Sequence, residues 1–504
     1  MPRLLVVDLG GTALRATVVD SDGGNVLSRA ARAVEQVIDA PPLGRSYDAG
    51  ALWDSACAAM REAVYRAGAG EPIAAVAATG QRIGCVALSQ GGAVLYAGPN
   101  LDTRGAATGW VVSEAAGDEL YTRTGRSLAL LYAPARLAWF RQERPEVFER
   151  IGRVLGLGDW LALKLCGEAA TEPSTAVDLL ALDVRSGEYW SELWSRCGLD
   201  PAWLPPLRRA GDCLGEVTEE AAQRTAVPPG TPVAVTAADS TAAMLGGGAA
   251  LPGTTLVLAG STLPVLAATD AVAEPDGVIW VGRHPVAGRG VVESNGGTAG
   301  FGWAWCAEKL VGQVSRLEGD AAYAHAERLA ASAPPAARDA LTFSGGPAIL
   351  NATRPATFLA RTHALLWPTE VLQPELGAAD VVRAALEAVA HSVRANAEQV
   401  EAVSADGRAP RLVVAGGMSR SPLFLRIVAA LLDRAVHAPA VRDASAAGAA
   451  VCAAVAAGLH PDLESAAGAL VRIEVAAEPE SALVPVYAAA HRAWRDLYAR
   501  MESM

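Results

Sequence analysis

The chain has 504 residues, of which 51% are hydrophobic and 19% are charged, and its net charge is −12. That length predicts two or three domains, and the composition is too apolar for a disordered protein. The negative charge disfavours nucleic acid as the main partner, because basic surfaces bind the phosphate backbone. No apolar run reaches the ~18 residues of a membrane-spanning helix, so we expect no membrane insertion.

The cysteines and the N-terminal residues favour a cytoplasmic protein. The seven cysteines are scattered and odd in number, and no two of them form a CxxC pair. Free thiols in a reducing compartment are the natural interpretation. The first residues, MPRLLVVDLGG, lack a cationic region followed by a long apolar segment and a cleavage site. We therefore expect no secretory signal.

The first half of the chain predicts a sheet that opens with two hairpins and then a largely helical region. Gly-Gly turns separate the first apolar runs, which is typical of antiparallel strands at the edge of a mixed sheet. Residues 105–200 follow mostly helical spacing, and this includes the segment 146–167. In chain order, we expect strands over 3–9, 15–20 and 25–30, a helix over 51–68, a strand over 73–80 and a hairpin over 86–95.

The pattern of the N-terminus restarts near residue 231. Residues 231–248 predict a strand, a turn with Asp239 and a helix of small residues, and 253–268 predict strand, Gly-Ser-Thr turn and strand. This repeats the order of residues 4–20, so we predict two domains of related build, 1–248 and 249–504. Further elements are expected as a helix over 378–403, a strand over 411–417 and a helix over 422–432.

The first candidate motif is the turn that follows Asp8. Gly10 and Gly11 have no β-carbon, so the backbone there can approach a phosphate group closely. The hydroxyl of Thr12 and the loop N–H groups can donate to phosphate oxygens, and Arg15 follows. Asp8 can hold a water of a Mg²⁺ ion, which keeps most of its waters in proteins. The alternative is an ordinary hairpin turn, for which Gly-Gly is common.

Two further glycine turns lie in the second half of the chain. Gly260-Ser261-Thr262 can form a matching phosphate loop, or it can be a plain hairpin. Gly416-Gly417 lies between a strand and a helix, where a flat base or a ribose can approach the backbone and the helix N-terminus adds donors. Ser421 can take part in this site or can cap the helix. Nothing matches GxxxxGK[ST], which disfavours a P-loop fold.

Asp239 is the candidate catalytic residue. It follows the apolar strand PVAVTAA and precedes small residues, so it lies at a strand end, where a carboxylate can face a domain cleft. As a general base it would accept the proton of an attacking hydroxyl. The alternative is that Asp239 caps the helix that starts with Ser240.

Together these motifs resemble the FGGY carbohydrate kinases over essentially the full length of the chain. The segments that carry the resemblance are VVDLGGTALRA, the stretch GLGDWLALKLCGEAATEPSTAVDLLALDVRSGEYW, GTPVAVTAADSTAAMLGGGAALPG and VVAGGMSRSPLFLRIVAALLDRAV. The resemblance implies an α/β fold with two actin/hexokinase-like, ribonuclease H-like domains and a cleft between them. It implies a kinase that phosphorylates a hydroxyl of a small sugar or sugar-like polyol with ATP and Mg²⁺.

The resemblance also assigns roles to single residues. Asp239 matches the family's base, and Asp8 and Asp239 are expected to hold the metal. The acceptor is expected at Gln81, Arg82, Asp102 and Arg104, mainly on the first domain. The nucleotide is expected, mainly on the second domain, at Gly10, Gly11, Thr12, Arg15, Gly260, Ser261, Thr262, Gly296, Gly297, Gly416, Gly417 and Ser421.

The chain departs from the family where the acceptor would bind. Xylulose-type kinases carry Met-His after Gly-Gln, whereas this chain has Arg82-Ile83; the branch that includes the bacterial autoinducer kinase carries an Arg there. A buried Arg needs acceptor oxygens, so we expect Arg82 to pair with Asp102 or with a ligand such as a hydrated diketone or an acid sugar. Otherwise Arg82 faces solvent, and Asp102 and Arg104 form a surface ion pair.

Three other functions stay open at this level. A nucleotide-dependent scaffold would keep the loops without an acceptor site, and a hydrolase would need a second carboxylate in a comparable motif. A degenerate family member could bind sugar without transferring phosphate, because 236–238 replace the usual glycines before Asp239. The sequence also leaves open whether two copies pair as a homodimer.

Overall fold

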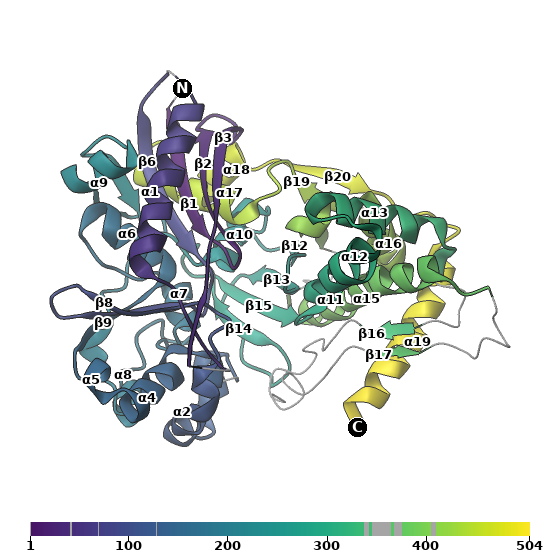
Figure 1. The fold of residues 1–504 in the computed structure, drawn as a ribbon, viewed down its shortest axis with the longest axis horizontal. Helices are drawn as coiled ribbons and strands as arrows, with labels where there is room; N and C mark the ends of the chain where they lie inside the picture. The colour runs from purple at the N-terminus through teal and green to yellow at the C-terminus, as the bar shows by residue number, and fades with distance from the viewer. Residues whose placement is uncertain are drawn as a thin grey trace.

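The structure is a computed structural model that describes residues 2–40, 43–68, 70–127, 129–336, 342–344, 364–366, 375–404 and 410–503. Two mixed β-sheets form the centres of two α/β bodies that lie side by side (Figure 1). This confirms the predicted fold class. In the described ranges, no helix is both long and apolar enough to cross a membrane. All seven cysteines are unpaired, and all but Cys213 are buried.

The first sheet has the strand order β10-β11-β6-β1-β2-β3. Strands β1, β2 and β3 are successive antiparallel neighbours, as predicted, while β6 runs parallel to β1, and β11 runs parallel to β6. Helix α1 packs its buried face on this sheet, and Asp48 starts it by accepting the N–H of Ala51 at 3.0 Å. The strands are β1 Arg3–Leu9, β2 Ala13–Asp20, β3 Val26–Ala33, β6 Ile73–Gly80, β10 Cys213–Glu216 and β11 Pro232–Ala234, and α1 is Ala49–Arg66.

The second sheet has the order β14-β15-β13-β12-β18-β19-β20. Its five strands β15-β13-β12-β18-β19 repeat β3-β2-β1-β6-β11 in order and in direction. The predicted internal repeat is therefore confirmed. These elements are β12 Thr254–Leu258, β13 Pro264–Thr269, β14 Trp280–Arg283, β15 Gly290–Asn295, β18 Arg411–Ala415, β19 Val436–Pro439 and β20 Ile473–Ala477, with helices α15 Ala378–Ser404 and α16 Pro422–Leu432 packed against them.

Two helices, α10 (Asp239–Gly246) and α17 (Ala444–Ala456), cross between the sheets. A β-carbon on Gly448 would lie 1.7 Å from the carbonyl oxygen of Ala242, and one on Gly246 would lie 2.1 Å from that of Ala444. The missing side chains thus let the two backbones touch. Helix α17 belongs to the C-terminal half but packs on β1 and β6 of the first sheet (Figure 1). The division at residue 248 stays a prediction.

A third sheet of β7 (Cys85–Ser89), β8 (Val94–Gly98) and β9 lies below the first sheet in the view of Figure 1, and it corrects one expectation. Residues 146–167 were expected to be helical, but Ile151–Gly156 form strand β9, which pairs with β7. The apolar residues of this stretch suit a helix or a buried strand equally well, and pairing with β7 decides between them.

The remaining elements complete the chain order. They are β4 Val37–Ala40, β5 Gly44–Ser46, β7 Cys85–Ser89, β8 Val94–Gly98, α2 Gly109–Ala116, α3 Glu119–Thr124, α4 Ala133–Glu143, α5 Pro145–Phe148, α6 Leu157–Cys166, α7 Pro173–Asp178, α8 Ser191–Arg196, α9 Glu219–Thr225, α11 Ala299–Trp305, a π-helix Cys306–Gly312, α12 Gln313–Ser315, α13 Gly319–Ser332, β16 Thr342–Ser344, β17 Ala364–Leu366, α18 Leu463–Leu470 and α19 Val484–Ser503.

Candidate active site

The ends of both sheets face a cavity of about 520 Å³. Its wall contains side chains and backbone from β2, α10, the β12–β13 turn, the turn after β18, and the start of α17. The structure therefore brings together segments that are far apart in the sequence. The predicted site residues in this wall are Arg15, Asp239, Gly260, Thr262, Gly416 and Gly417.

The β1–β2 turn, Gly10-Gly11-Thr12, lies directly beside Arg15. The N–H of Gly10 donates to the carbonyl oxygen of Ala13 at 3.1 Å and closes the turn. A β-carbon on Gly10 would lie 2.9 Å from Nη1 of Arg15, whereas one on Gly11 would meet no atom within 4 Å. Gly10 thus makes room for the Arg15 side chain, and Gly11 leaves open space beside the turn.

Asp8 is a buried carboxylate with one oxygen unused. Its Oδ2 accepts the hydroxyl of Ser445 at 3.1 Å and lies 4.0 Å from Nη1 of Arg15. Its Oδ1 is buried and has no hydrogen-bond partner among the described residues. Burial raises the pKa of Asp8 to about 8, helped by the charges of Asp443 and Asp239 and opposed by Arg15. The unused oxygen is suited to a water held by a divalent cation.

Backbone hydrogen bonds to the residues that follow β15 fix the second predicted phosphate loop, Gly260-Ser261-Thr262. The N–H of Gly296 donates to the carbonyl oxygen of Leu263 at 2.8 Å, and the N–H of Leu263 donates to that of Gly297 at 3.2 Å. Gly297 has a φ of 58°, in the left-handed region that glycine tolerates best. Gly296 and Gly297 therefore shape the loop but do not line the cavity.

The turn after β18 presents bare backbone to the cavity. Gly416 has a φ of 89°, and a β-carbon there would lie 2.8 Å from the carbonyl oxygen of Ala259. A β-carbon on Gly417 would meet no atom within 4 Å, so Gly417 faces open space. Ser421 is the cap of α16, because its Oγ accepts the N–H of Phe424 at 3.1 Å. A contact between Ser421 and nucleotide stays a prediction.

Arginines that the sequence did not single out complete the cavity wall. Arg29 forms an ion pair with Asp443 at 2.5 Å, and Arg420 and Arg442 also line the cavity. Nη1 of Arg442 is buried without a hydrogen-bond partner in the part of the chain that the structure describes. Together with Arg15, these side chains give the wall the positive charge that a polyphosphate needs.

Asp239 is the first residue of α10. The N-cap position belongs to Ala238, so Asp239 is not the capping residue. Its Oδ1 accepts the backbone N–H of Ser240 at 2.7 Å and that of Arg82 at 3.1 Å. Burial raises the pKa of Asp239, while the charge of Arg82 and the two N–H groups act to lower it. From α7, Thr175 accepts the N–H of Ala238 at 3.1 Å and fixes the start of α10.

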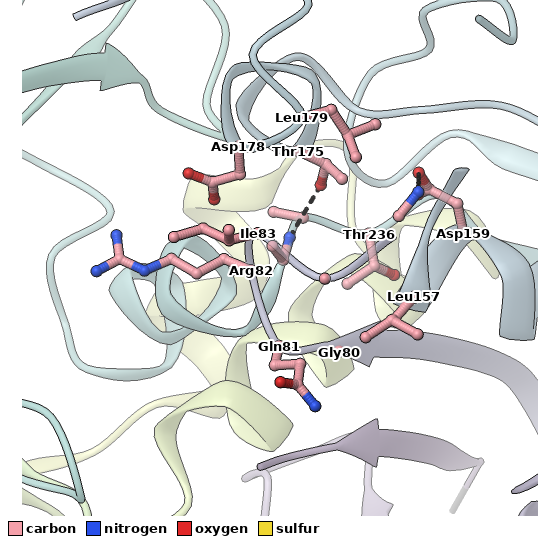
Figure 2. A pocket seen from close by; sticks show the side chains of 15 residues that line it. Gly80, Gln81, Arg82, Ile83, Leu157, Asp159, Thr175, Asp178, Leu179 and Thr236 are labelled. Atoms are coloured by element: carbon pink, nitrogen blue, oxygen red, sulfur yellow. Dashed lines mark hydrogen bonds between the residues drawn. The ribbon is translucent and has the colours of Figure 1, made fainter. Parts of the chain in front are cut away.

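A second, nearly closed cavity lies on the other side of this helix start. It measures about 10 Å³, which is room for about one water molecule. Ala238 lines this small cavity and Asp239 lines the large one, so the peptide between them separates the two. In Figure 2, Arg82 and Asp178 lie on one side of the small cavity and Asp159 lies on the opposite side.

Arg82 is paired with a residue of the other body, which corrects the expected partner. Its Nη1 and Nη2 donate to Oε2 and Oε1 of Glu293, both at 2.6 Å. Glu293 lies on β15, and the two side chains are 11% and 3% exposed. Arg82 is therefore neither paired with Asp102 nor directed to solvent. Burial is the largest influence on Glu293 and acts to raise its pKa, but the charge and hydrogen bonds of Arg82, together with Arg126 and Asn295, outweigh it, so the pKa is lowered.

The backbone at Ile83 supports a special role for this loop. Ile83 has a φ of 69°, a conformation that a β-branched residue rarely adopts. Such a residue costs ~1–3 kcal/mol and is found mainly where function constrains the backbone. Gln81 in the same loop is fixed, because its Nε2 donates to the Tyr47 hydroxyl at 2.6 Å and its Oε1 accepts the N–H of Asn100 at 2.9 Å.

Asp102 and Arg104 are buried rather than exposed, so the surface ion pair is wrong. Nε of Arg104 donates to Oδ2 of Asp102 at 2.7 Å, and the two side chains are 0% and 1% exposed. The guanidinium also lies 4.7 Å from the ring of Tyr96 and 4.9 Å from that of Trp139. Neither residue lines either cavity, and their contact with an acceptor stays a prediction.

Comparisons with known proteins agree with this geometry. Residues 3–246 match the N-terminal domain of the FGGY family of carbohydrate kinases, and residues 253–457 match its C-terminal domain. The chain is 30% identical to the autoinducer-2 kinase of Salmonella paratyphi A, over 98% of this chain and 94% of that protein.

Solved structures give the same picture. The crystal structure of xylulose kinase from Rhodospirillum rubrum is similar with a TM-score of 0.82 and 28% identity, and the match covers 99% of each chain. A glycerol kinase from Plasmodium falciparum with ADP has a TM-score of 0.81 at 15% identity, over 99% of this chain and 98% of that one, which shows the shared fold alone.

Proposed function

Because the chain belongs to the FGGY family of carbohydrate kinases, we propose that it transfers the γ-phosphate of ATP to a hydroxyl of a small sugar or sugar-like polyol. The nucleotide would occupy the large cavity and the acceptor the small one. The single observation that carries this arrangement is the position of Asp239 at the boundary between the two cavities. A carboxylate placed there can contact an acceptor hydroxyl and still face the phosphate that moves.

Asp239 would act as the general base. Its Oδ1 is fixed by two backbone N–H groups, and Oδ2 accepts no hydrogen bond among the described residues. The free oxygen can take the proton of the attacking hydroxyl. Fixed orientation of this kind is what a general base needs, because proton transfer depends on hydrogen-bond reach to the substrate.

The large cavity fits the phosphates of ATP. Arg15, Arg420 and Arg442 supply positive charge around it, and Gly260, Gly416 and Gly417 line it without side chains. Charge on a transferring phosphoryl group is met mainly by such preorganised donors, so positioning and electrostatics carry most of the catalysis. The adenosine would lie along Gly416 and Gly417, which both line the cavity without a side chain, with Gly417 bordering open space.

Mg²⁺ fits the residues present. Oδ1 of Asp8 is buried and unpartnered, and Asp239 is close enough to raise the pKa of Asp8 by its charge. Bound with the nucleotide, Mg²⁺ would neutralise phosphate charge. The described residues hold no cluster of three His, Cys, Asp or Glu side chains that could bind a metal. That agrees with an ion that keeps its waters and binds through one or two carboxylates.

The small size of the second cavity has a consequence for acceptor entry. A space of about 10 Å³ is too small for a sugar, so the two bodies must move apart before the acceptor binds. Closure around the acceptor would exclude water and suppress ATP hydrolysis. The side chains that bridge the bodies here, Arg82 and Glu293, would separate and rejoin in each cycle.

The test is an ADP-formation assay with Mg·ATP and a panel of pentuloses, polyols and the linear autoinducer precursor. Mass spectrometry of the acceptor would check that ADP formation goes with a phosphorylated product. We expect at least one acceptor to be phosphorylated at a rate far above the rate of ATP hydrolysis in its absence. ADP release that no acceptor stimulates would contradict the proposal and favour a chain that binds sugar without transferring phosphate.

A further inference from the structure

The acceptor side of the site contains an unusual balance of buried charges. Arg82 donates to both oxygens of Glu293, and Oε1 also accepts Nδ2 of Asn295 at 3.0 Å. Glu293 is therefore held in place by two partners. Arg82 uses two of its five N–H donors in this pair, and three stay available for a ligand oxygen.

Each of the two neighbouring guanidinium groups already has a carboxyl group as its counter-charge. Arg126 donates to Asp178 at 3.3 Å, and the charges of Glu293, Asp178 and Asp239 all act on Arg82. Two guanidinium groups thus share their surroundings with three carboxyl groups. An uncharged ligand leaves this balance as it is. A ligand with a carboxylate would bring one more negative charge into a site where no cation lacks a counter-charge.

Two further buried polar groups nearby are neutral and unused. The hydroxyl of Tyr132 and Nε1 of Trp280 are buried and have no hydrogen-bond partner among the described residues. The Trp280 ring lies 5.9 Å from the guanidinium of Arg82 and 5.5 Å from that of Arg126. Leaving a buried polar group unpaired costs ~1–3 kcal/mol, so a ligand that supplies hydroxyl or carbonyl oxygens here would be stabilised.

We infer that Glu293 is a positioning residue that neutralises Arg82, so that the site selects uncharged polyhydroxy acceptors and rejects acceptors with a carboxylate. This inference rests on the proposed function, because it concerns the acceptor of that reaction. Of the two ligands considered for Arg82, a hydrated diketone and an acid sugar, it favours the first, which is an uncharged compound with several hydroxyl groups. A carboxylate at the remaining donors of Arg82 would place a second buried negative charge beside Glu293 with no further cation to neutralise it.

The experiment compares matched acceptors that differ at one end only, namely polyols of four to six carbons and the aldonic acids of the same configuration. Binding is measured by calorimetry, and turnover by ADP formation with Mg·ATP, for the wild type and for Glu293→Gln. We expect the wild type to prefer the polyol in every pair that it binds. Glu293→Gln frees Arg82, and should shift the ratio of acid to polyol affinity by ~10-fold or more towards the acid.

Glu62→Gln is the matched control, because it removes a carboxylate paired with arginines, Arg32 and Arg66, outside both cavities. It should leave the ratio unchanged. If Glu293→Gln does not fold, the wild-type preference still decides, and Asp178→Asn provides a second variant, which should shift the ratio in the same direction.

Two results would overturn the inference: acids that bind the wild type as tightly as their polyols, or a ratio that Glu293→Gln leaves unchanged. A wild type that phosphorylates no acceptor of any charge would instead refute the proposed kinase activity. Binding of polyols without ADP formation would leave the charge preference standing and refute phosphotransfer alone.

Discussion

The two central sheets share one topology but present different chemistry at corresponding positions. Counting back from the turn glycines Gly10 and Gly260, the position of Asp8 in β1 is taken by Leu258 in β12. After the parallel neighbours β6 and β18, the first body continues with Gln81 and the second with Gly416. The first body thus offers side chains and the second offers bare backbone.

This difference teaches how one fold divides two tasks. Small hydroxyl-bearing ligands need charged and polar side chains at fixed positions, and in the proposed function Gln81 and Arg82 of the first body would supply them. A nucleotide has a large flat base and several phosphates, and it needs room and backbone N–H groups. In the proposed function the second body would supply the room at Gly417, where a β-carbon would meet no atom within 4 Å. The repeat therefore preserves the strand order and changes the residues at the strand ends.

For this comparison, the largest expected effect comes from removing the carboxylate of Asp8, whose corresponding position in the second sheet is Leu258. Asp8→Asn should lower kcat by ~10²-fold, because a neutral amide replaces the proposed anchor of the metal beside the phosphates. Steady-state kinetics at saturating Mg²⁺ would measure it. The same change at Asp20, a buried carboxylate at the end of β2 that lines neither cavity, should leave kcat within about twofold. Equal activity of the two variants would contradict the assigned difference between the sheets.

The crossing of α10 and α17 joins the two sheets and should be sensitive to a single methyl group. A β-carbon on Gly448 would lie 1.7 Å from the carbonyl oxygen of Ala242, so Gly448→Ala should lower the free energy of unfolding by ~1–3 kcal/mol. Denaturant unfolding would measure the change. Gly468→Ala, on the exposed face of α18 where a β-carbon meets no atom within 4 Å, should stabilise the protein slightly. A neutral Gly448→Ala would show that the helices do not touch as described.

Adding a side chain to the bare backbone of the second body should affect ATP alone. Gly417 borders open space, so Gly417→Val fits the protein but would crowd the nucleotide. We expect the KM for ATP to rise by ~10-fold, which is about 1.4 kcal/mol, with the KM for the acceptor nearly unchanged. The control is Gly468→Val, which introduces the same group outside the site. An equal rise in both KM values would argue against an adenosine site at this turn.

The smallest effect concerns a proton. With a pKa of about 8, Asp8 keeps its proton in the folded protein over a pH range in which the carboxyl group of an ordinary Asp has lost its proton. Its contribution to stability is therefore greatest below about pH 4, and it is lost as the pH rises towards 8, unless a bound cation takes the proton's place. Binding of Mg·nucleotide near pH 7 should release up to about one proton, and much less at pH 9.

Calorimetry in buffers of different ionisation enthalpy would count the released protons. Asp8→Asn should abolish the difference between the two pH values, because no carboxyl group is left to titrate there. If the wild type releases the same number of protons at pH 7 and pH 9, Asp8 does not carry the proton assigned to it.

The sequence predicts the sheets and the loops of the large cavity because their signals are local. Gly10, Gly260 and Gly416 each follow an apolar strand, and the lack of a β-carbon has the same meaning in sequence and structure. The partner of Arg82 could not be found in this way. Glu293 is 211 residues away, and only the packing of the two bodies brings them together. A charged residue inside the apolar strand GVVESN was the one available signal.

Other errors have similar causes. Asp102 and Arg104 are close in sequence, so their pairing could be predicted, but their burial depends on Tyr96 and Trp139 from other segments. Strand β9 was missed because its apolar run has no period that separates a strand from a helix. Local patterns therefore predicted the glycine turns near the large cavity, while contacts between distant segments determine the charges around Arg82.

Replacing Asp239 by Asn tests most directly whether this residue, at the boundary of the two cavities, accepts the proton of the attacking acceptor hydroxyl. The amide keeps the size of the side chain and can still accept the N–H groups of Arg82 and Ser240 through its oxygen, so ATP and acceptor should bind within about threefold of the wild type. Turnover, measured by ADP formation and by the phosphorylated product, should fall by ~10²-fold or more. Turnover that survives the substitution, with binding unchanged, would contradict the role of Asp239 as the base.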